Sequence, residues 1–365
     1  MVLRHKLRGQ SVGVVFGTFA PMHIGHVDLI HRAKRENDAG VVVVVSGENT
    51  AEDRGTKVGL HLDRRLRYVR EVFRDDELVA VVKLDEEGMP PYPEGWKPWL
   101  QKLENAVSEV IEDVNYWQIY VGEEIYQREL DKRCDDKVIK THLIERSIIP
   151  ISATQIRQNP YDYWKYITKP FRRHFTKKVL IVGSASGGKT TLVRDLARVY
   201  NAPYSLEYAR SYQDINNVRD DELDTYDYVR LLDGQYNQTA SVIDSGSHTG
   251  LIFADTNSSV TKAYYDYYFE DSSPKDKRMI ESLYQSIVAR EQWDLVVLVE
   301  PNTTYVDDGF RDMTMSDQAI RDDFTNHLLS LLAPFKDILI TVNGDFFENY
   351  DCIKQTIAER LAIEL

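Results

Sequence analysis

From Gly17 to His26 the chain reads Gly-Thr-Phe-Ala-Pro-Met-His-Ile-Gly-His, between an apolar run and a helical pattern. Residues 11–16 form a short apolar run that is typical of a buried strand, and residues 24–35 place apolar side chains at helical spacing. A loop that joins a strand to a helix presents unpaired backbone N–H groups where the helix dipole favours an anion. The stretch therefore predicts a strand, a phosphate-binding loop and a helix, and a nucleotide site is the first hypothesis.

The side chains of this loop suit phosphate chemistry. Gly17 and Gly25 let the backbone approach a ligand closely, and His23 and His26 lie about one turn apart on one helical face. Imidazoles in that position can stabilise charge on a reacting phosphate. For a bare His-x-x-His a surface or metal-binding pair is the simpler interpretation. The surrounding residues, in their strand-to-helix context, favour the nucleotide site.

Length and composition limit the classes of protein. A chain of 365 residues predicts two domains. The net charge of −13 and the pI near 5.2 argue against a nucleic-acid-binding protein, which usually carries a basic face. No apolar stretch is long enough to span a bilayer, and the first residues do not lead into a signal peptide, so we expect no membrane insertion and a cytoplasmic location. Cys134 and Cys352 are far apart, so neither a zinc site nor a disulfide is expected.

The first half of the chain alternates strands and helices. Five consecutive valines at 41–45 are typical of a parallel strand that is buried on both faces. A helix and two more strands are predicted at 60–73, 79–84 and 118–121. The alternation predicts a Rossmann-like α/β domain with a mainly parallel sheet, whose ligands lie beyond the carboxyl ends of the strands. The Gly17 loop lies at that edge, and so does Gly122, which directly follows a strand.

A loop rich in Pro and Gly, at residues 86–96, carries aromatic side chains. Tyr92, Trp96 and the nearby Trp99 either pack on the loop itself or stack on a planar ligand ring, and both alternatives stay open at this point.

A second candidate phosphate site closes this half. The stretch Ile151-Ser-Ala-Thr-Gln-Ile-Arg157 places Ser152 where it would cap a short helix, and Arg157 follows about a turn and a half later. The N–H groups at the helix start and the arginine would together clamp a phosphate. The alternative is a capped surface helix with an incidental arginine.

The two motifs resemble those of the HxGH nucleotidyltransferase superfamily. Gly17 to His26 matches its opening G-x-F-x-P-x-H-x-G-H, and residues 151–157 match its I-S-x-T-x-x-R motif. Adenylyl transfer sends a substrate phosphate oxygen against the α-phosphorus of ATP and expels pyrophosphate, so the enzyme mainly positions two anions and neutralises charge. The resemblance implies catalytic roles for His23, His26 and Arg157. It implies nucleotide contacts from Gly17, Thr18, Phe19, Gly25, Gly122, Ser152 and Thr154.

The second half begins after a partly basic linker, which we predict at residues 160–178. Gly183 to Thr190 reads G-S-A-S-G-G-K-T between an apolar run and a helical pattern, which is a P-loop in its required context. Lys189 would contact the β- and γ-phosphates of ATP, and Thr190 would bind Mg²⁺, with Asp255 as a second candidate metal ligand. The expected nucleotide contacts are Gly183, Ser186, Gly187, Gly188, Thr190 and Thr191.

Further stretches of this half are candidates for substrate contacts. Residues 302–311 have turn chemistry, which suits a lid whose Arg311 stabilises the transferring phosphate; an exposed loop with an idle arginine is the alternative. Glu207 and Arg210 follow a strand-like segment and suit a sugar diol or a hydroxyl. Tyr264 and the tyrosines beside it are interpreted as helix packing. Strands at 296–299 and 338–342 and a helix at 347–362 complete a second α/β domain.

The chain as a whole resembles the NadR family of bifunctional nicotinamide-nucleotide adenylyltransferases and ribosylnicotinamide kinases, from about Val12 onward. The resemblance implies an adenylyltransferase domain at 1–159 and a P-loop kinase domain at 179–365. It implies substrate contacts from Trp96, Tyr92, Glu207, Arg210, Tyr305 and Asp308. Family relatives have an acidic residue at the position of Ser211 and can have one at the position of Asn257. The identity of the general base of the kinase therefore stays open, with Asp255 and Glu207 as the candidates.

The function implied by this resemblance is NAD salvage. Nicotinamide riboside would be phosphorylated by Mg-ATP to NMN, and NMN would accept AMP from a second ATP, giving NAD and pyrophosphate. Nothing in the chain resembles the DNA-binding domain of enteric members, so no nucleic-acid partner is expected. As an alternative, one domain serves as an NAD sensor or transporter-docking module, or the same chemistry acts on another nucleoside. A homo-oligomer is compatible with the sequence.

Overall fold

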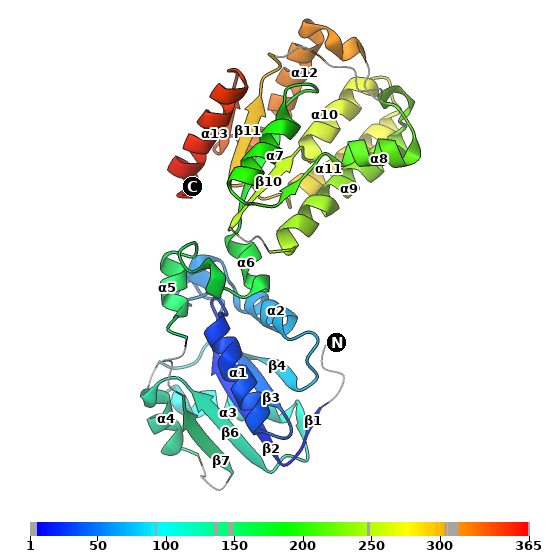
Figure 1. Cartoon of the computed structure of the whole chain (residues 1–365). Coiled ribbons are helices and arrows are strands. Elements are labelled where there is room, and N and C mark those ends of the chain that lie inside the picture. The colour runs from blue at the N-terminus through cyan, green and yellow to red at the C-terminus, as the bar shows by residue number, and fades with distance from the viewer. Residues whose placement is uncertain are drawn as a thin grey trace. The chain divides into compact units, whose positions relative to one another are not determined.

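The computed structural model describes residues 6–91, 93–134, 138–144, 149–246, 249–302, 305 and 313–363. The chain divides into two compact units, Met1–His174 and Phe175–Leu365, and each has a parallel sheet of its own (Figure 1). The predicted fold class, two α/β domains with mainly parallel sheets, is therefore confirmed. Three predicted site residues, Tyr92, Asp308 and Arg311, lie outside the described residues.

The N-terminal unit is built on a five-stranded parallel sheet with the strand order β4-β3-β2-β6-β7. Its strands are β2 (Ser11–Gly17), β3 (Val41–Gly47), β4 (Val79–Asp85), β6 (Tyr116–Val121) and β7 (Ile139–Leu143), and β1 (Leu7–Arg8) pairs with β5 (Ile111–Glu112) in a separate sheet. From β2 the sheet grows through β3 and β4 on one side, and β6 and β7 are added on the other. The order reverses beside β2, which is where open α/β sheets bind ligands. The predicted phosphate loop directly follows β2.

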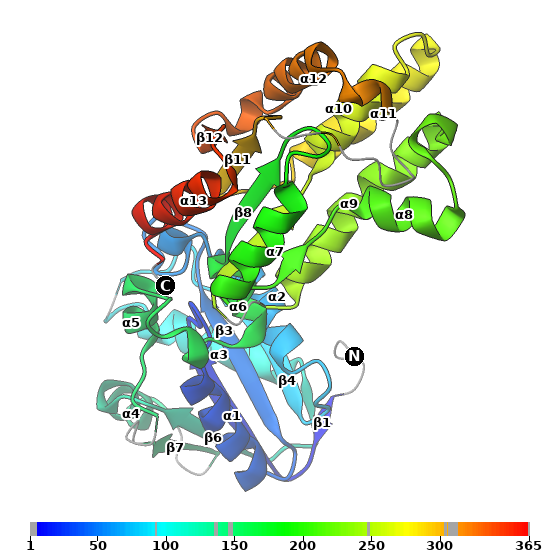
Figure 2. The ribbon, with the colours of Figure 1, turned by 45° about the horizontal axis from the view of Figure 1, so that its top comes forward.

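Helices cover both faces of this sheet (Figure 2). They are α1 (Ile24–Glu36), α2 (Leu62–Val72), α3 (Trp96–Ser108), α4 (Glu124–Asp131), α5 (Ala153–Gln158) and α6 (Lys169–Phe175), with short 3-10 turns η1 (Thr56–Val58) and η2 (Trp164–Tyr166). Val14 and Val42 pack with Leu103 of α3 in one core. On the opposite face, a Cβ on Gly13 would lie 2.9 Å from the carbonyl oxygen of Ala33 in α1. Glycine here lets α1 approach β2 closely, which fixes the loop between them.

The predicted linker at 160–178 is folded. Helix α6 places Phe171, which is fully buried, edge-on against Tyr68 of α2 with ring centroids 5.2 Å apart. A ring nitrogen of His174 lies 2.6 Å from the Val58 carbonyl oxygen, and Arg173 pairs with Glu71. These contacts hold the segment to the N-terminal unit, so the chain passes to the second unit only after His174.

The C-terminal unit has a second five-stranded parallel sheet, in the order β12-β11-β8-β10-β9. Its strands are β8 (Lys177–Val182), β9 (Tyr204–Ser205), β10 (Leu251–Asp255), β11 (Leu295–Val299) and β12 (Leu339–Val342). The central strand β8 begins two residues before the predicted Val179 and ends directly before the P-loop. Strand β10 pairs with it in register, Asp255 opposite Ile181, so Asp255 reaches the same edge of the sheet.

Helices also cover both faces of this second sheet (Figure 1). They are α7 (Lys189–Val199), α8 (Tyr208–Asn216), α9 (Thr225–Asp244), α10 (Ser258–Tyr268), α11 (Pro274–Val288), α12 (Gln318–Leu331) and α13 (Phe346–Leu361), with 3-10 turns η3 (Asp220–Glu222), η4 (Met313–Ser316) and η5 (Ala333–Phe335). Ile181 packs with residues of α7 and α13, whereas Leu180 packs with α10, α11 and α12. A separate core joins α8 and α9 to α10 and α11. Within the described part of the chain, no helix has the length and apolar character needed to cross a membrane.

Candidate nucleotide sites

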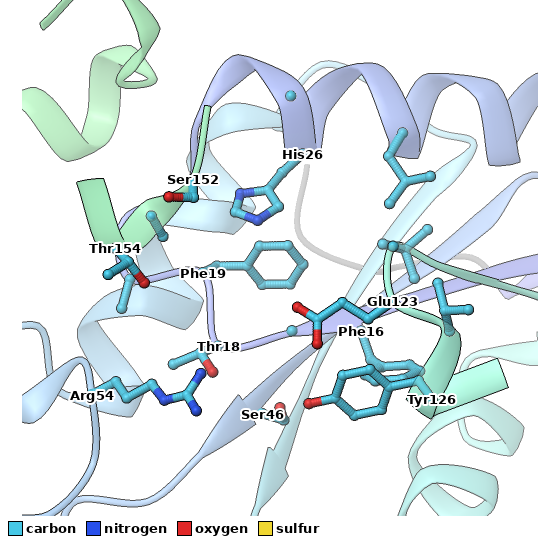
Figure 3. A pocket seen from close by; sticks show the side chains of 18 of the residues that line it. Phe16, Thr18, Phe19, His26, Ser46, Arg54, Glu123, Tyr126, Ser152 and Thr154 are labelled. Carbon is cyan, nitrogen blue, oxygen red and sulfur yellow. The ribbon is translucent and has the colours of Figure 1, made fainter. Parts of the chain in front are cut away.

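A cavity of about 760 Å³ opens at the carboxyl edge of the N-terminal sheet. It is lined by every described site residue that the sequence predicted for this half: Gly17, Thr18, Phe19, His23, Gly25, His26, Trp96, Gly122, Ser152, Thr154 and Arg157. Figure 3 shows Thr18, Phe19 and His26 on one part of the wall, with Ser152 and Thr154 beside them. The structure thus brings the two motifs to one cavity.

The histidines of the loop are tightly arranged. The rings of His23 and His26 stack with centroids 3.7 Å apart, and the backbone N–H of His23 donates to Nδ1 of His26 at 3.3 Å. A Cβ on Gly25 would lie 3.1 Å from the His23 ring, so a larger residue would displace that ring. Phe19 has a φ of 47° and packs edge-on against His26 at 5.1 Å. The loop therefore presents the His26 ring to the cavity in a defined orientation.

Arg157 links the second motif to the first. One of its guanidinium nitrogens donates to the carbonyl oxygen of Ala20 at 2.7 Å, and the other donates to Oγ1 of Thr154 at 2.9 Å. Ser152 caps α5 as predicted, because its hydroxyl accepts from the N–H of Gln155 at 3.2 Å. Burial lowers the pKa of Arg157 from its ordinary value. It remains a cation at neutral pH, since an arginine is effectively always protonated.

The other end of the cavity is aromatic and acidic. Phe16 lies edge-on to Trp99 at 4.8 Å and to Tyr126 at 5.4 Å, and Trp96 lies edge-on to the same two rings at 5.7 and 5.9 Å. The Trp99 indole N–H donates to the Glu86 carboxylate at 2.9 Å, and burial raises the pKa of that carboxyl. Sequence reasoning missed Phe16, Tyr126 and Glu86. The available signals were the position of Phe16 directly before the loop and that of Glu86 at the start of the Pro- and Gly-rich stretch.

Beneath the loop, Arg65 of α2 is fully buried. It donates to the carbonyl oxygens of Thr18 at 2.8 Å and Ser46 at 3.2 Å, and it pairs with Asp53 at 2.9 Å. Burial lowers the pKa of Arg65, while the charge of Asp53 opposes this shift. A Cβ on Gly47 would lie 2.7 Å from this guanidinium. Arg65 therefore fastens the phosphate loop to the end of β3, and nothing in the sequence indicated this role.

In the C-terminal unit the P-loop has the backbone that its glycines allow. Gly183 and Gly188 have φ values of 149° and 79°, and a Cβ on Gly183 would lie 2.4 Å from the carbonyl oxygen of Val299. The Lys189 ammonium donates to the carbonyl oxygen of Ser184 at 2.8 Å. The Thr190 hydroxyl donates to Asp255, which is fully buried. Burial raises the pKa of Asp255, and the charge of Lys189 opposes this shift.

A cavity of about 280 Å³ lies beside this P-loop. The predicted residues that line it are Ser186, Gly187, Gly188, Lys189, Thr190, Thr191, Glu207, Arg210 and Tyr305. Gly183 shapes the loop without lining the cavity, and Asp255 reaches it through Thr190. Tyr264 also lines this cavity, and its hydroxyl oxygen accepts from the N–H of Ala185 at 3.1 Å. The interpretation of Tyr264 as helix packing alone was therefore incomplete.

Arg321 of α12 is a further residue at the P-loop that the sequence did not indicate. It is 2% exposed, donates to the carbonyl oxygen of Ala185 at 3.4 Å, and lies 5.8 Å from the ring centroid of Tyr305. Within the described ranges, no group of three or more His, Cys, Asp or Glu side chains is arranged to hold a metal ion. The Thr190 and Asp255 oxygens nevertheless suit Mg²⁺, which protein sites usually hold through one or two carboxylates together with substrate phosphates.

Known proteins resemble the chain over nearly its whole length. Residues 14–159 match the cytidylyltransferase-like family and residues 178–348 match an AAA domain family. The trifunctional NAD biosynthesis/regulator protein NadR of Salmonella typhimurium is 30% identical, over 97% of this chain and 85% of its own length. A crystal structure of NadR protein in complex with NR is 37% identical with a TM-score of 0.87, and covers 99% of each chain. Another, in complex with NAD and AMP-PNP, is 36% identical with a TM-score of 0.85, over 99% of this chain and 98% of that one.

These matches agree with the two sites. The chain has a nucleotidyltransferase domain and a P-loop kinase domain, so it is a transferase related to NAD biosynthesis. The predicted resemblance is confirmed: the chain belongs to the NadR family.

Proposed function

We propose that the protein makes NAD in two ATP-dependent steps. The C-terminal unit transfers the γ-phosphoryl group of ATP to the 5′-hydroxyl of nicotinamide riboside, giving NMN. The N-terminal unit transfers AMP from ATP to the NMN phosphate, giving NAD and releasing pyrophosphate. Solved relatives bound to NR, and to NAD with AMP-PNP, support these ligands for this chain. We assign the first step to residues 179–365 and the second to residues 1–159.

The polarity of the first cavity is the observation that best supports this proposal. His26 and Arg157 lie in the two phosphate motifs, while the Trp96 and Trp99 rings and the Glu86 carboxylate line the same cavity. NMN has the same polarity, because it carries a phosphate at one end and a cationic pyridinium ring at the other. Aromatic faces and a carboxylate attract a flat organic cation. A neutral base in place of nicotinamide would gain nothing from the charge of Glu86.

The chain's own groups position the adenylyl-transfer reactants. The ring of His26 and the remaining N–H donors of Arg157 stabilise the charge that develops around the α-phosphorus and on departing pyrophosphate. Arg157 also holds the loop through Ala20, so binding and loop geometry are linked. The NMN phosphate is already ionised near neutral pH, so the attacking oxygen needs no general base. Positioning of the two anions supplies most of the rate enhancement.

In the kinase site, the P-loop amides and Lys189 bind the ATP phosphates. Thr190 and Asp255 would hold Mg²⁺, which when bound neutralises charge on the transferring phosphoryl group. Glu207 and Arg210, whose charged atoms lie 3.8 Å apart, face the same cavity and orient the ribose of the riboside. Tyr305 stacks on its ring. The proton of the 5′-hydroxyl passes to Glu207, which lines the cavity, or to Asp255, which is hydrogen-bonded to Thr190 of the P-loop.

Chromatography of products from nicotinamide riboside and Mg-ATP tests the proposal. The wild-type protein is expected to form NMN and then NAD. Lys189→Ala is expected to abolish NMN formation but to make NAD from supplied NMN, and His26→Ala is expected to make NMN that accumulates. A different product from wild type would reject the substrate. Loss of both steps in either folded variant would reject two separate sites.

A further inference from the structure

Arg54 lines the first cavity but belongs to neither phosphate motif. It lies in the segment after β3, residues 48–55, and it is an exposed residue. Figure 3 shows the Arg54 side chain directed into the cavity beside Thr18, with Thr154 on the neighbouring wall. The loop after β2, the second motif and the segment 48–55 therefore meet at the phosphate end of the cavity. Arg54 is the basic residue that the segment 48–55 contributes.

The backbone on both sides of Arg54 is anchored. The Asp53 carboxylate accepts from the N–H of Gly55 at 2.8 Å and from that of Thr56 at 2.9 Å, which closes a tight turn around Arg54. The same carboxylate pairs with Arg65, and the side chains of these two partners are 7% and 0% exposed. Since Arg65 also holds the Thr18 carbonyl oxygen, one buried guanidinium fixes Arg54 relative to the phosphate loop.

The guanidinium of Arg54 is available to an anion, although Glu48, Glu52 and Asp53 line the same cavity. Within the described ranges, no carboxylate forms an ion pair with Arg54, although Asp53 precedes it and Glu52 is close in sequence. Arg54 and Arg157 line one cavity, and the positive charge of Arg54 contributes to lowering the pKa of Arg157 after the larger effect of burial. Two cations held near each other repel. A polyphosphate bound between them would attract both and so offset the repulsion.

Lys57 provides the contrast within the same segment. Its ammonium group pairs with Glu52 at 2.9 Å, and it does not line the cavity. An exposed basic residue with a surface role would resemble Lys57. Arg54 differs from it because it faces the site and because a buried ion pair maintains its position.

We propose that Arg54 is a further catalytic residue of the N-terminal site, contacting the β- and γ-phosphates of ATP, and that the Asp53–Arg65 pair positions it. The inference rests on the proposed adenylyl transfer. In that step a bond forms between the NMN phosphate oxygen and the α-phosphorus of ATP. The bond from the α-phosphorus to the bridging oxygen breaks, and pyrophosphate leaves with the electron pair. Arg54 stays protonated and stabilises the charge that the leaving group gains.

Two measurements on one set of variants test the role of Arg54. In a Lys189→Ala background, which disables the P-loop site, we expect Arg54→Ala to lower kcat/KM for pyrophosphate release from ATP and NMN about 10²-fold. ATP binding to the N-terminal cavity, followed by calorimetry, is expected to weaken in parallel. Arg54→Lys should retain part of the kcat/KM and part of the ATP affinity, and Lys57→Ala should change neither quantity. If Arg54→Ala had the same kcat/KM and the same ATP affinity as its parent, the inference would be overturned.

The binding arm separates this inference from the proposed function. If the parent protein released no pyrophosphate but Arg54→Ala still weakened ATP binding, the phosphate contact would stand and the proposed adenylyl transfer would fail. For the positioning pair, Asp53→Asn should cause a similar loss, and adding Arg54→Ala to it should cause little further loss, because residues that act together are not additive. If the loss of kcat/KM in the double variant equalled the product of the two single losses, Asp53 would not act by positioning Arg54.

Discussion

At the residue scale, the half-buried Glu86 carboxylate is expected to serve substrate binding at a cost in stability. Burial raises the pKa of its carboxyl, so the folded chain holds this proton more tightly than the unfolded chain does. Between the unfolded and the raised folded pKa, the folded state binds more protons, and stability therefore falls as pH rises through that interval. When this carboxylate is ionised, its burial lowers the stability of the fold, and a cationic substrate ring would offset that cost.

Glu86→Gln is expected to separate these two effects. Glutamine can still accept from the Trp99 indole N–H but carries no charge, so the free energy of unfolding should rise at neutral pH while KM for NMN rises about tenfold, or ~1.4 kcal/mol of binding energy. KM for the wild type should also rise on acidification, starting above the pH at which an ordinary glutamate titrates, and the variant should lack this rise. Urea unfolding and steady-state kinetics measure both. Glu87→Gln, at an exposed neighbour, is the control, and the same rise in KM there would contradict the role of Glu86.

The residues that sequence could and could not predict differ in a physical way. His23, His26, Ser152 and Lys189 act through local backbone, since a helix start or a P-loop turn is set by neighbours in sequence. Their positions could be read from spacing. Glu86 meets the cavity only because β4 lies in the same sheet as β2, which no local pattern encodes.

At the element scale, the main strands were predictable and several helices were not. The valines of β3 indicated a buried strand directly, because a strand covered on both faces must be apolar throughout. Helix α9 was not predicted. Its core is formed with the aromatic residues of α10 and with α11, and its sequence is rich in Tyr, Asp, Gln and Thr, so the apolar stripe is weak. Helix α3 starts at Trp96, the last residue of the stretch predicted to be a loop. The Pro and Gly residues just before it favoured the loop prediction.

The contacts of α6 lead to a prediction about the segment between the two sheets. Phe171 is fully buried against Tyr68, so Phe171→Ala should remove ~3–5 kcal/mol from the stability of the N-terminal unit, as is usual for a buried phenylalanine. Urea unfolding followed by Trp fluorescence would measure the loss. Phe347→Ala is the control, because that ring is 72% exposed and its removal should change stability by less than about 0.5 kcal/mol. If Phe171→Ala lowered the free energy of unfolding as little as Phe347→Ala, then α6 would not contribute to the stability of the N-terminal unit.

At the scale of the whole molecule, the described lining of each cavity comes from a single unit. Every described residue that lines the first cavity lies within Met1–His174, and every one that lines the second lies within Phe175–Leu365. The repeated strand–loop–helix order made this two-site plan predictable from sequence. The polarity of the first cavity was not predictable, since it depends on which loops the strand order brings together.

If each proposed step needs only the cavity of its own unit, two variants that each lack one step should complement each other between molecules. Neither His26→Ala nor Lys189→Ala alone should make NAD from nicotinamide riboside, but an equimolar mixture should, because NMN released by the first variant can bind to the intact N-terminal cavity of the second. NAD should appear after a lag that shortens as protein concentration rises, since a free intermediate must first accumulate. Chromatography of timed samples measures the lag, and adding NMN at the start should abolish it. If each variant kept its own step yet the mixture made no NAD, NMN would have to pass between the two sites without leaving the chain, and the sites would then be separate in structure but not in function.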